Sequence, residues 1–264
     1  MEFFTDHDWL HRQPPHAFQW DHILFIVLAM IVGIVAAIIL RKKASRKVVH
    51  IVLISLWGVY IAVVLTYYIF IYSQVISNPS EHPFSMESML PLHSCLMFMY
   101  VCPFALFSKN KIVRTAASNF LVIINMIMGF ITLFVGCPST GYSALSFHGI
   151  QSLIYHAIDV IVPLIMLVTK YYDIQKKDFL YGLAVFVALA VTVWIFDAIA
   201  RCDYFYFYDG HTFPVFKFIS ENVHHLVWTL IVGSCYIITA IATHFSAIGI
   251  KALVNLKKNK TSEA

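Results

Sequence analysis

The chain has 264 residues, of which 60% are hydrophobic and 12% are charged, and its mean hydropathy is +0.77. This balance is far from that of a water-soluble domain, and it also excludes a disordered chain, a collagen-like chain and a small disulfide framework. The sequence therefore predicts an all-α, polytopic membrane protein with short connections and no sizeable soluble domain.

Seven apolar runs, each long enough to cross ~30 Å of hydrocarbon as a helix, follow one another along the chain. The first run, Ile23–Leu40, is uncharged. The acidic segment ahead of it is not a secretory signal, because no small-residue cleavage site follows. We predict a seven-transmembrane-helix bundle over residues 23–250, between an extracytoplasmic segment (1–22) and a basic tail (251–264). The later runs are roughly Val48–Tyr72, Met89–Phe107, Thr115–Gly136, Phe147–Thr169, Phe179–Ala200 and Val223–Ile248.

Basic residues alternate between the predicted loops, with 15 of the 18 Lys and Arg on one side and Arg12, Arg201 and Lys217 on the other. By the positive-inside rule the amino terminus is outside and the carboxyl terminus is cytoplasmic, in the cell membrane. We expect membrane lipids as partners and no nucleic acid, and the sequence predicts no particular oligomeric state. The clusters are Arg41, Lys42, Lys43, Arg46 and Lys47; Lys109, Lys111 and Arg114; Lys170, Lys176 and Lys177; Lys251, Lys257, Lys258 and Lys260.

Ionisable side chains inside a membrane cost ~2.5–3.5 kcal/mol each on insertion scales, so they mark packing or functional sites. The third predicted helix begins with LPLHSC, residues 90–95, which places Cys95 about 9 Å below its outer end. The fifth places His156 at a compatible depth of about 13 Å. His156 and Asp159 share a helical face, so the carboxylate can fix the imidazole tautomer. Other polar residues toward the outer side are His93, His148, Gln151, Asp197, Arg201, Glu221, His224 and His225.

A thiol near an imidazole is the minimum set for acyl transfer, because the base raises the thiolate fraction and the thiolate attacks an ester. Cys95 with His156 fits this chemistry. The alternative is that Cys95 only packs, as buried cysteines commonly do. The five cysteines contain no CxxC, so a zinc ribbon is unsupported, and Cys137 and Cys202 lie at outer ends where a disulfide can form.

Several other residues are expected to serve packing. Asn125 lies in the middle of the fourth span and is predicted to hydrogen-bond a neighbouring helix. The aromatic run at residues 204–208 predicts an interfacial belt or a cap over the outer face. Close helix contacts are expected at small residues, namely Gly58, Gly129, Gly149, Gly182 and Gly233.

The LPLHSC segment resembles the LPLHxC motif of the bacterial YwaF-type (TP0381 family) integral membrane proteins. A second block, from Gly129 through Cys137-Pro138 and residues 147–151 to Pro163-Leu164, is similar to their next motif. The chain departs from that pattern at Met128, where relatives often have Trp, and at Ser139, where they have Asp or Glu. The resemblance covers nearly the whole chain.

The same family is similar to a eukaryotic transmembrane protein described as a cysteine-dependent phospholipid acyltransferase. That resemblance implies Cys95 as the acyl-accepting nucleophile and His156 as its partner, with His93 as the motif's own histidine. Asp159 would orient His156, and no cofactor or metal is implied. Residues expected to contact substrate are His148, Gln151, Arg201, His224 and His225.

Two other functions use the same polar residues. In the first, His93, His156, His224 or His225 and Asp159 or Asp197 bind zinc in an intramembrane lipid hydrolase. The last helix, however, lacks the HxxxH of seven-helix lipid amidases. In the second, the cluster binds a small solute in a transporter or receptor, although no inverted repeat is evident.

Overall fold

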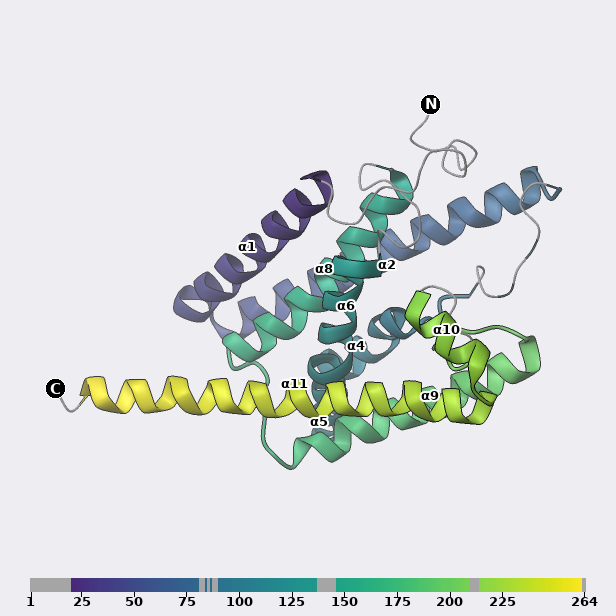
Figure 1. Cartoon of the computed structure of the whole chain (residues 1–264). Helices are drawn as coiled ribbons and strands as arrows, with labels where there is room; N and C mark the ends of the chain where they lie inside the picture. The colour runs from purple at the N-terminus through teal and green to yellow at the C-terminus, as the bar shows by residue number, and fades with distance from the viewer. Residues whose placement is uncertain are drawn as a thin grey trace.

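The computed structural model describes residues 20–80, 84, 86, 90–136, 146–208 and 214–262, except the side chains of 135–136, 214–216 and 254–262. All regular structure in these residues is helical, which confirms the predicted all-α class (Figure 1). The elements are α1 (Trp20–Lys43), α2 (Arg46–Ser77), the 3-10 helix η1 (Ser94–Leu96), α4 (Met97–Phe107), α5 (Lys111–Phe120), the π-helix η2 (Leu121–Asn125), α6 (Met126–Ile131), the π-helix η3 (Thr132–Gly136), α8 (Phe147–Val168), α9 (Asp178–Ala200), α10 (Pro214–Asn222) and α11 (His225–Ser262).

In the described part of the chain, six helices are long and apolar enough to cross a membrane. The third predicted span is shorter than expected, because its helix begins at Ser94 and covers only η1 and α4. At 1.5 Å per residue this helix is about 20 Å long. Pro91 accounts for the absence of helix at Leu90, because the residue before a proline is disfavoured in helical backbone. The six long helices are α1, α2, the composite helix Lys111–Phe134, α8, α9 and the Trp228-containing stretch His225–Leu253 of α11.

Two helices form the centre of the bundle. In the most apolar stretch of α8 and of the composite helix, 61% of the residues are buried inside the protein. The corresponding share is 17% in α1 and 22% in α2, α9 and α11. In Figure 1, α1 lies on one side of α8 and α6, α2 crosses behind α8, and α9 and α11 lie on the other side. The main hydrophobic core includes Phe98, Phe120, Val162 and Trp228. Residues carried by α8 and by the composite helix are therefore the ones held most firmly.

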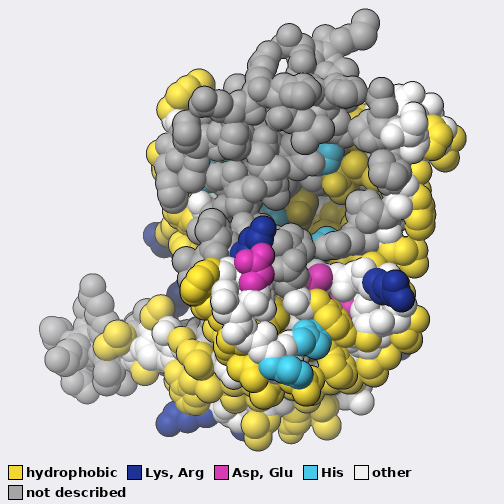
Figure 2. Space-filling model, turned by 45° about the vertical axis from the view of Figure 1, so that its right-hand side comes forward, with side chains coloured by type: hydrophobic (Ala, Val, Ile, Leu, Met, Phe, Trp, Pro, Cys, Tyr) yellow, Lys and Arg dark blue, Asp and Glu magenta, His cyan; other side chains and the backbone are white. Residues whose placement is uncertain are grey.

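The outward faces of the helices are apolar. Hydrophobic side chains cover much of the face that Figure 2 shows. Val32, Ile69, Leu180 and Leu230 are examples that are 63% to 70% exposed. A soluble monomer rarely exposes such an extended apolar surface, so these faces suit lipid.

The predicted basic loops gather at one end of the bundle, which we call the basic end: the α1–α2 and α4–α5 connections and the α8–α9 loop. Arg46 donates to the Tyr171 carbonyl at 3.3 Å, and His50 Nδ1 lies 2.7 Å from the Tyr171 hydroxyl. The His50 ring also contacts Phe107 at the end of α4. The alternation of charge in the sequence is thus matched by the arrangement of the helices, while the side of the membrane that this end faces stays a prediction.

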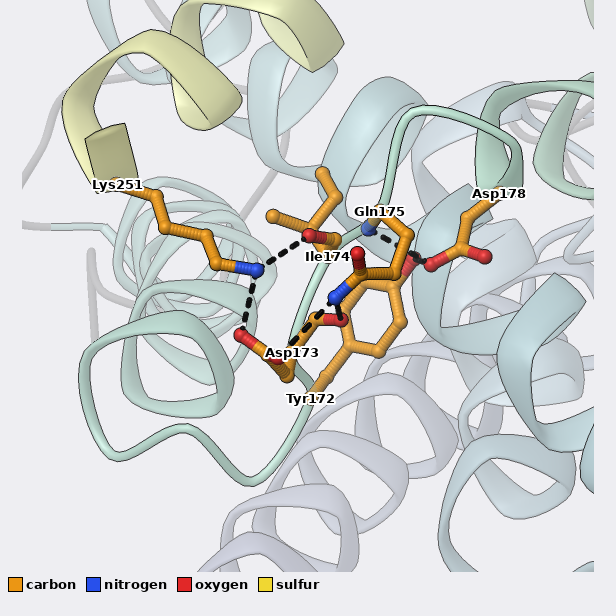
Figure 3. Close-up of polar contacts among 6 residues, drawn as sticks. All are labelled: Tyr172, Asp173, Ile174, Gln175, Asp178 and Lys251. Atoms are coloured by element: carbon orange, nitrogen blue, oxygen red, sulfur yellow. Dashed lines mark hydrogen bonds and ion pairs between the residues drawn. The ribbon is translucent and has the colours of Figure 1, made fainter.

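The last helix also reaches the basic end. Lys251 Nζ lies 2.8 Å from Asp173 Oδ1 and donates to the Ile174 carbonyl at 2.9 Å (Figure 3). Beyond this contact α11 continues past the predicted boundary at Ile250 and projects from the bundle as helix to Ser262 (Figure 1).

A buried polar network lies beneath these contacts, and we call Asn119, Tyr172, Asp178 and His244 the basic-end network. Asn119 Nδ2 donates to the Tyr172 hydroxyl at 3.1 Å and lies 3.1 Å from His244 Nδ1. The Tyr172 hydroxyl donates to Asp178 Oδ2 at 3.0 Å, and the Gln175 N–H donates to the same oxygen at 2.9 Å (Figure 3). Burial, and then the Asp178 carboxylate, raise the pKa of Tyr172 above its usual value.

Candidate active site

The LPLHSC segment ends in a tight turn that begins a helix. The Leu96 N–H donates to the His93 carbonyl at 2.8 Å, which closes the 3-10 turn of η1. Cys95 therefore lies in the first turn of its helix. The sequence had predicted a position further inside the helix, about 9 Å from its outer end. The residue is partly exposed, whereas Ser94 and Leu96 on either side are buried. A cysteine that is not fully buried, in the first turn of a helix, is a suitable place for a nucleophile.

The backbone of Cys95 is held from two sides. Its carbonyl accepts a hydrogen bond from the Tyr60 hydroxyl of α2 at 3.2 Å and another from Asn125 Nδ2 of η2 at 3.1 Å. Tyr60 and Asn125 are both fully buried. The predicted role of Asn125 as an interhelical hydrogen-bond donor is confirmed, and its partner is the motif cysteine.

The pair on α8 lies beside this turn. His156 Nδ1 is 3.4 Å from Asp159 Oδ2, and both side chains are buried. Asp159 interacts electrostatically with Cys95, and His156 does so with His93. Between the described residues no hydrogen bond joins the Cys95 thiol to the His156 imidazole.

Tyr155 of α8 also lies near Cys95, and sequence reasoning missed it. Its ring lies 5.8 Å from the Tyr60 ring and 4.1 Å from the His156 ring. We call Cys95, Tyr60, Asn125, Tyr155, His156 and Asp159 the thiol site.

Gly129 allows α6 to approach α8 closely at this level. A Cβ added to it would lie 2.6 Å from Asp159 Cβ and 3.0 Å from the His156 carbonyl oxygen. Gly182 makes a comparable approach to Asn119, so both glycines are close-contact positions as predicted. The same prediction is wrong for Gly58 and Gly233, because no atom lies within 4 Å of a Cβ at either position.

The aromatic run at residues 204–208 forms a cap, one of its two predicted roles. Tyr204 is fully buried, donates to the Met86 carbonyl, and stands edge-on to the His93 ring at 5.0 Å. Two carboxylates fold the cap, since the Tyr204 N–H donates to Asp197 at 3.1 Å and the Tyr208 N–H donates to Asp203 at 3.0 Å. The cap places an aromatic ring against the motif histidine.

The residues predicted to contact substrate fall into two places. His148 and Gln151 are buried on α8, where His148 Nε2 lies 3.2 Å from the Tyr67 hydroxyl. Arg201 ends α9 in a left-handed conformation and is exposed. The structure does not bring Arg201 together with the thiol site.

The two adjacent histidines lie at the start of α11. His224 is exposed, and its Nδ1 accepts a hydrogen bond from the Leu226 N–H. His225 stacks on Tyr208 of the cap with ring centroids 4.4 Å apart. Burial, and then Asp197 and Asp203, raise the pKa of Tyr208. Both histidines thus belong to the surroundings of the cap.

Metal binding gains no support from this geometry. Within the described ranges, no group of three or more His, Cys, Asp and Glu side chains is placed to hold an ion. Cys137, the expected disulfide partner of Cys202, lies outside the described residues.

A family model described as TMEM164 family matches residues 17–241, which covers α1 through most of the membrane part of α11 and includes the whole thiol site. No curated protein and no solved structure matches the chain.

Proposed function

This chain belongs to the TMEM164 family of multi-pass membrane proteins, and we propose that it is a lipid acyltransferase that works through an acyl-enzyme on Cys95. The observation that carries the proposal is the difference in burial and in hydrogen bonding between two cysteines on one short helix. Cys102 is fully buried and packs in the hydrophobic core. Cys95 is partly exposed, its carbonyl is fixed by two side-chain hydrogen bonds, and it lies near Tyr155 and Asp159.

The proposed reaction has two balanced steps. The Cys95 thiol gives up its proton and its sulfur attacks the ester carbonyl of a donor lipid; the C–O bond breaks, the alcohol leaves with a proton, and a thioester remains. A hydroxyl of a second lipid then attacks the thioester, loses its proton and releases the thiol. No oxidant, reductant or cofactor enters either step.

His156 is the proposed base in both steps, oriented by Asp159 at 3.4 Å. Hydrogen bonds used in catalysis are often long in the absence of substrate, and substrate closure brings the groups together. Tyr155, which lies near Cys95, is the proposed donor to the oxyanion of the tetrahedral intermediate.

We also propose seven crossings, with α4 as the short third crossing, the amino terminus outside and the thiol site toward the outer leaflet of the cell membrane. The gathering of the basic loops at one end supports this orientation. An impermeant maleimide added to intact cells should label Ser80→Cys, which follows α2, and should label Ser45→Cys at the basic end only after permeabilisation. The reverse pattern would invert the topology.

The function is tested by incubating the purified protein with an alkyne-tagged phospholipid and locating the label by mass spectrometry. A hydroxylamine-labile acyl group should appear on Cys95, disappear in Cys95→Ser and fall strongly in His156→Ala. Cys235→Ser is the matched control, because Cys235 is an exposed thiol on α11. Absence of label on Cys95 across several lipid classes would reject the acyl-enzyme and leave solute transport or reception as the alternative.

A further inference from the structure

Two side chains from different helices converge on one carbonyl oxygen, that of Cys95. In a regular helix a carbonyl in the first turn is satisfied by the N–H four residues later, so it does not need side-chain donors. Here Tyr60 and Asn125 both donate to it, and each has no exposed surface. The carbonyl therefore ties η1 to α2 and to η2.

The position of Asn125 is unfavourable for stability alone. It ends a π-helix, a rare conformation that frequently marks functional sites. Its Oδ1 is buried and accepts no hydrogen bond from any residue that the structure describes. An apolar side chain would avoid the cost of that orphaned oxygen. The amide is explained if its Nδ2 is needed at Cys95.

The effect of these bonds on the thiol follows from the geometry of the peptide group. The group is planar, so fixing the carbonyl oxygen of Cys95 also fixes the N–H of Leu96, which closes the turn onto His93. With the turn closed, the direction of the Cα–Cβ bond of Cys95 has little freedom, and the sulfur is limited to the staggered positions about that bond. The bonds therefore act on where the sulfur points without touching the sulfur.

We propose that Tyr60 and Asn125 are positioning residues, which hold the Cys95 peptide so that its thiol faces Tyr155 and the His156–Asp159 pair. As a statement about catalysis, this rests on the proposed acyltransferase function. As a statement about geometry, it concerns the reactivity of the Cys95 thiol toward any electrophile.

The chain offers matched controls in the basic-end network. Asn119 is fully buried on the same composite helix, donates through Nδ2, and leaves its Oδ1 without a partner within the described structure, as Asn125 does. Tyr172 is a buried tyrosine whose hydroxyl is hydrogen-bonded, as that of Tyr60 is. Asn125→Leu is therefore compared with Asn119→Leu, and Tyr60→Phe with Tyr172→Phe.

Two rates are measured on each variant: alkylation of Cys95 by iodoacetamide over a range of pH, and acyl labelling of Cys95 by the alkyne-tagged phospholipid. In Tyr60→Phe and Asn125→Leu, we expect the maximal acyl-labelling rate to fall about 10- to 100-fold, as for other residues that orient a reacting group, with little change in the half-saturating lipid concentration. The pH profile of alkylation should also change. Asn119→Leu and Tyr172→Phe should lower the melting temperature and leave both rates as in the wild type.

The two proposals fail in different ways. If the wild type takes no acyl label, the acyltransferase function fails, and the alkylation profiles still decide whether Tyr60 and Asn125 set the geometry of the thiol. If alkylation in Tyr60→Phe, which removes a single oxygen, matches that of Tyr172→Phe, the positioning role is overturned. It is also overturned if the loss of labelling in all four variants simply follows their loss of thermal stability.

Discussion

In the basic-end network, Asp178 accepts hydrogen bonds from Tyr172 and from the Gln175 N–H. In the thiol site, Asp159 is buried just as completely, yet its oxygens accept no hydrogen bond from the described residues and meet only His156, at ion-pair distance. Gln151 Oε1, also buried on α8, is a further acceptor without a partner in the described structure. A buried carboxylate without donors costs stability, so the two carboxylates differ in purpose: Asp178 holds helices together, and Asp159 stays available for a reaction.

The largest difference between the two regions is expected when the carboxylate of each is replaced by an amide. Asp159→Asn should reduce acyl labelling of Cys95 on the order of 100-fold, because His156 loses the group that orients it. Its melting temperature should stay the same or rise, because a buried carboxyl group without hydrogen-bond donors is removed. Asp178→Asn should do the opposite, lowering the free energy of unfolding by about 1–3 kcal/mol with labelling unchanged. If both variants lost acyl labelling, or both lost stability, Asp159 and Asp178 would not have different roles.

The close approaches at Gly129 and Gly182 give a second pair. Either glycine replaced by alanine would meet a neighbour that must shift, at a cost of about 1–3 kcal/mol in unfolding free energy. Only Gly129→Ala displaces α8 at His156 and Asp159, so only it should also slow acyl labelling, by about tenfold. Denaturation in detergent and the labelling assay measure the two effects separately, and slow labelling in Gly182→Ala would contradict the assignment.

A smaller effect is expected at the surface of the basic end. Lys251→Ala removes an ion pair with Asp173, which is 54% exposed, and a hydrogen bond to the Ile174 carbonyl. Exposed ion pairs contribute about 0.2–1 kcal/mol and weaken with salt. Melting curves of Lys251→Ala, Asp173→Ala and the double variant at low and high salt should show this coupling, with acyl labelling constant throughout.

The smallest effects should come from Arg201→Ala and His225→Ala. Arg201 is exposed, and His225 contacts the cap through a stacked ring, so their loss should leave acyl labelling within about twofold of the wild type. A large rise in the half-saturating lipid concentration in either variant would restore it as a residue that binds substrate.

Much of the helical framework could be predicted from the sequence, because hydropathy and charge act over whole segments. The alternation of basic loops predicted that these loops lie together at the basic end. The three-residue spacing predicted the contact of His156 with Asp159. Asn125 was identified as a hydrogen-bonding position, since a polar residue within an apolar span needs a partner.

The rest depends on contacts that spacing does not encode. The absence of helix at Leu90 could have been inferred from Pro91, but the π-helix that places Asn125 has no simple sequence signal. The approach of Tyr60 and Tyr155 to Cys95 requires the order of the helices around the bundle, which hydropathy does not contain. The cap is folded by Asp197 and Asp203, which accept hydrogen bonds from its backbone. Their spacing in the sequence is that of ordinary loop residues, so it does not predict these bonds.

The placement of α1 has a consequence for how the chain enters the membrane. α1 packs chiefly against α8, with Ile26 and Val160 in a hydrophobic cluster apart from the main core, and His22 contacts the Leu133 carbonyl. All these partners are synthesised more than 100 residues after α1 begins. During synthesis on the ribosome, α1 therefore lacks these contacts until residues 133–160 have been made. The uncharged run Ile23–Leu40 suits it to that interval, so assembly of the first helix is completed only when α8 arrives.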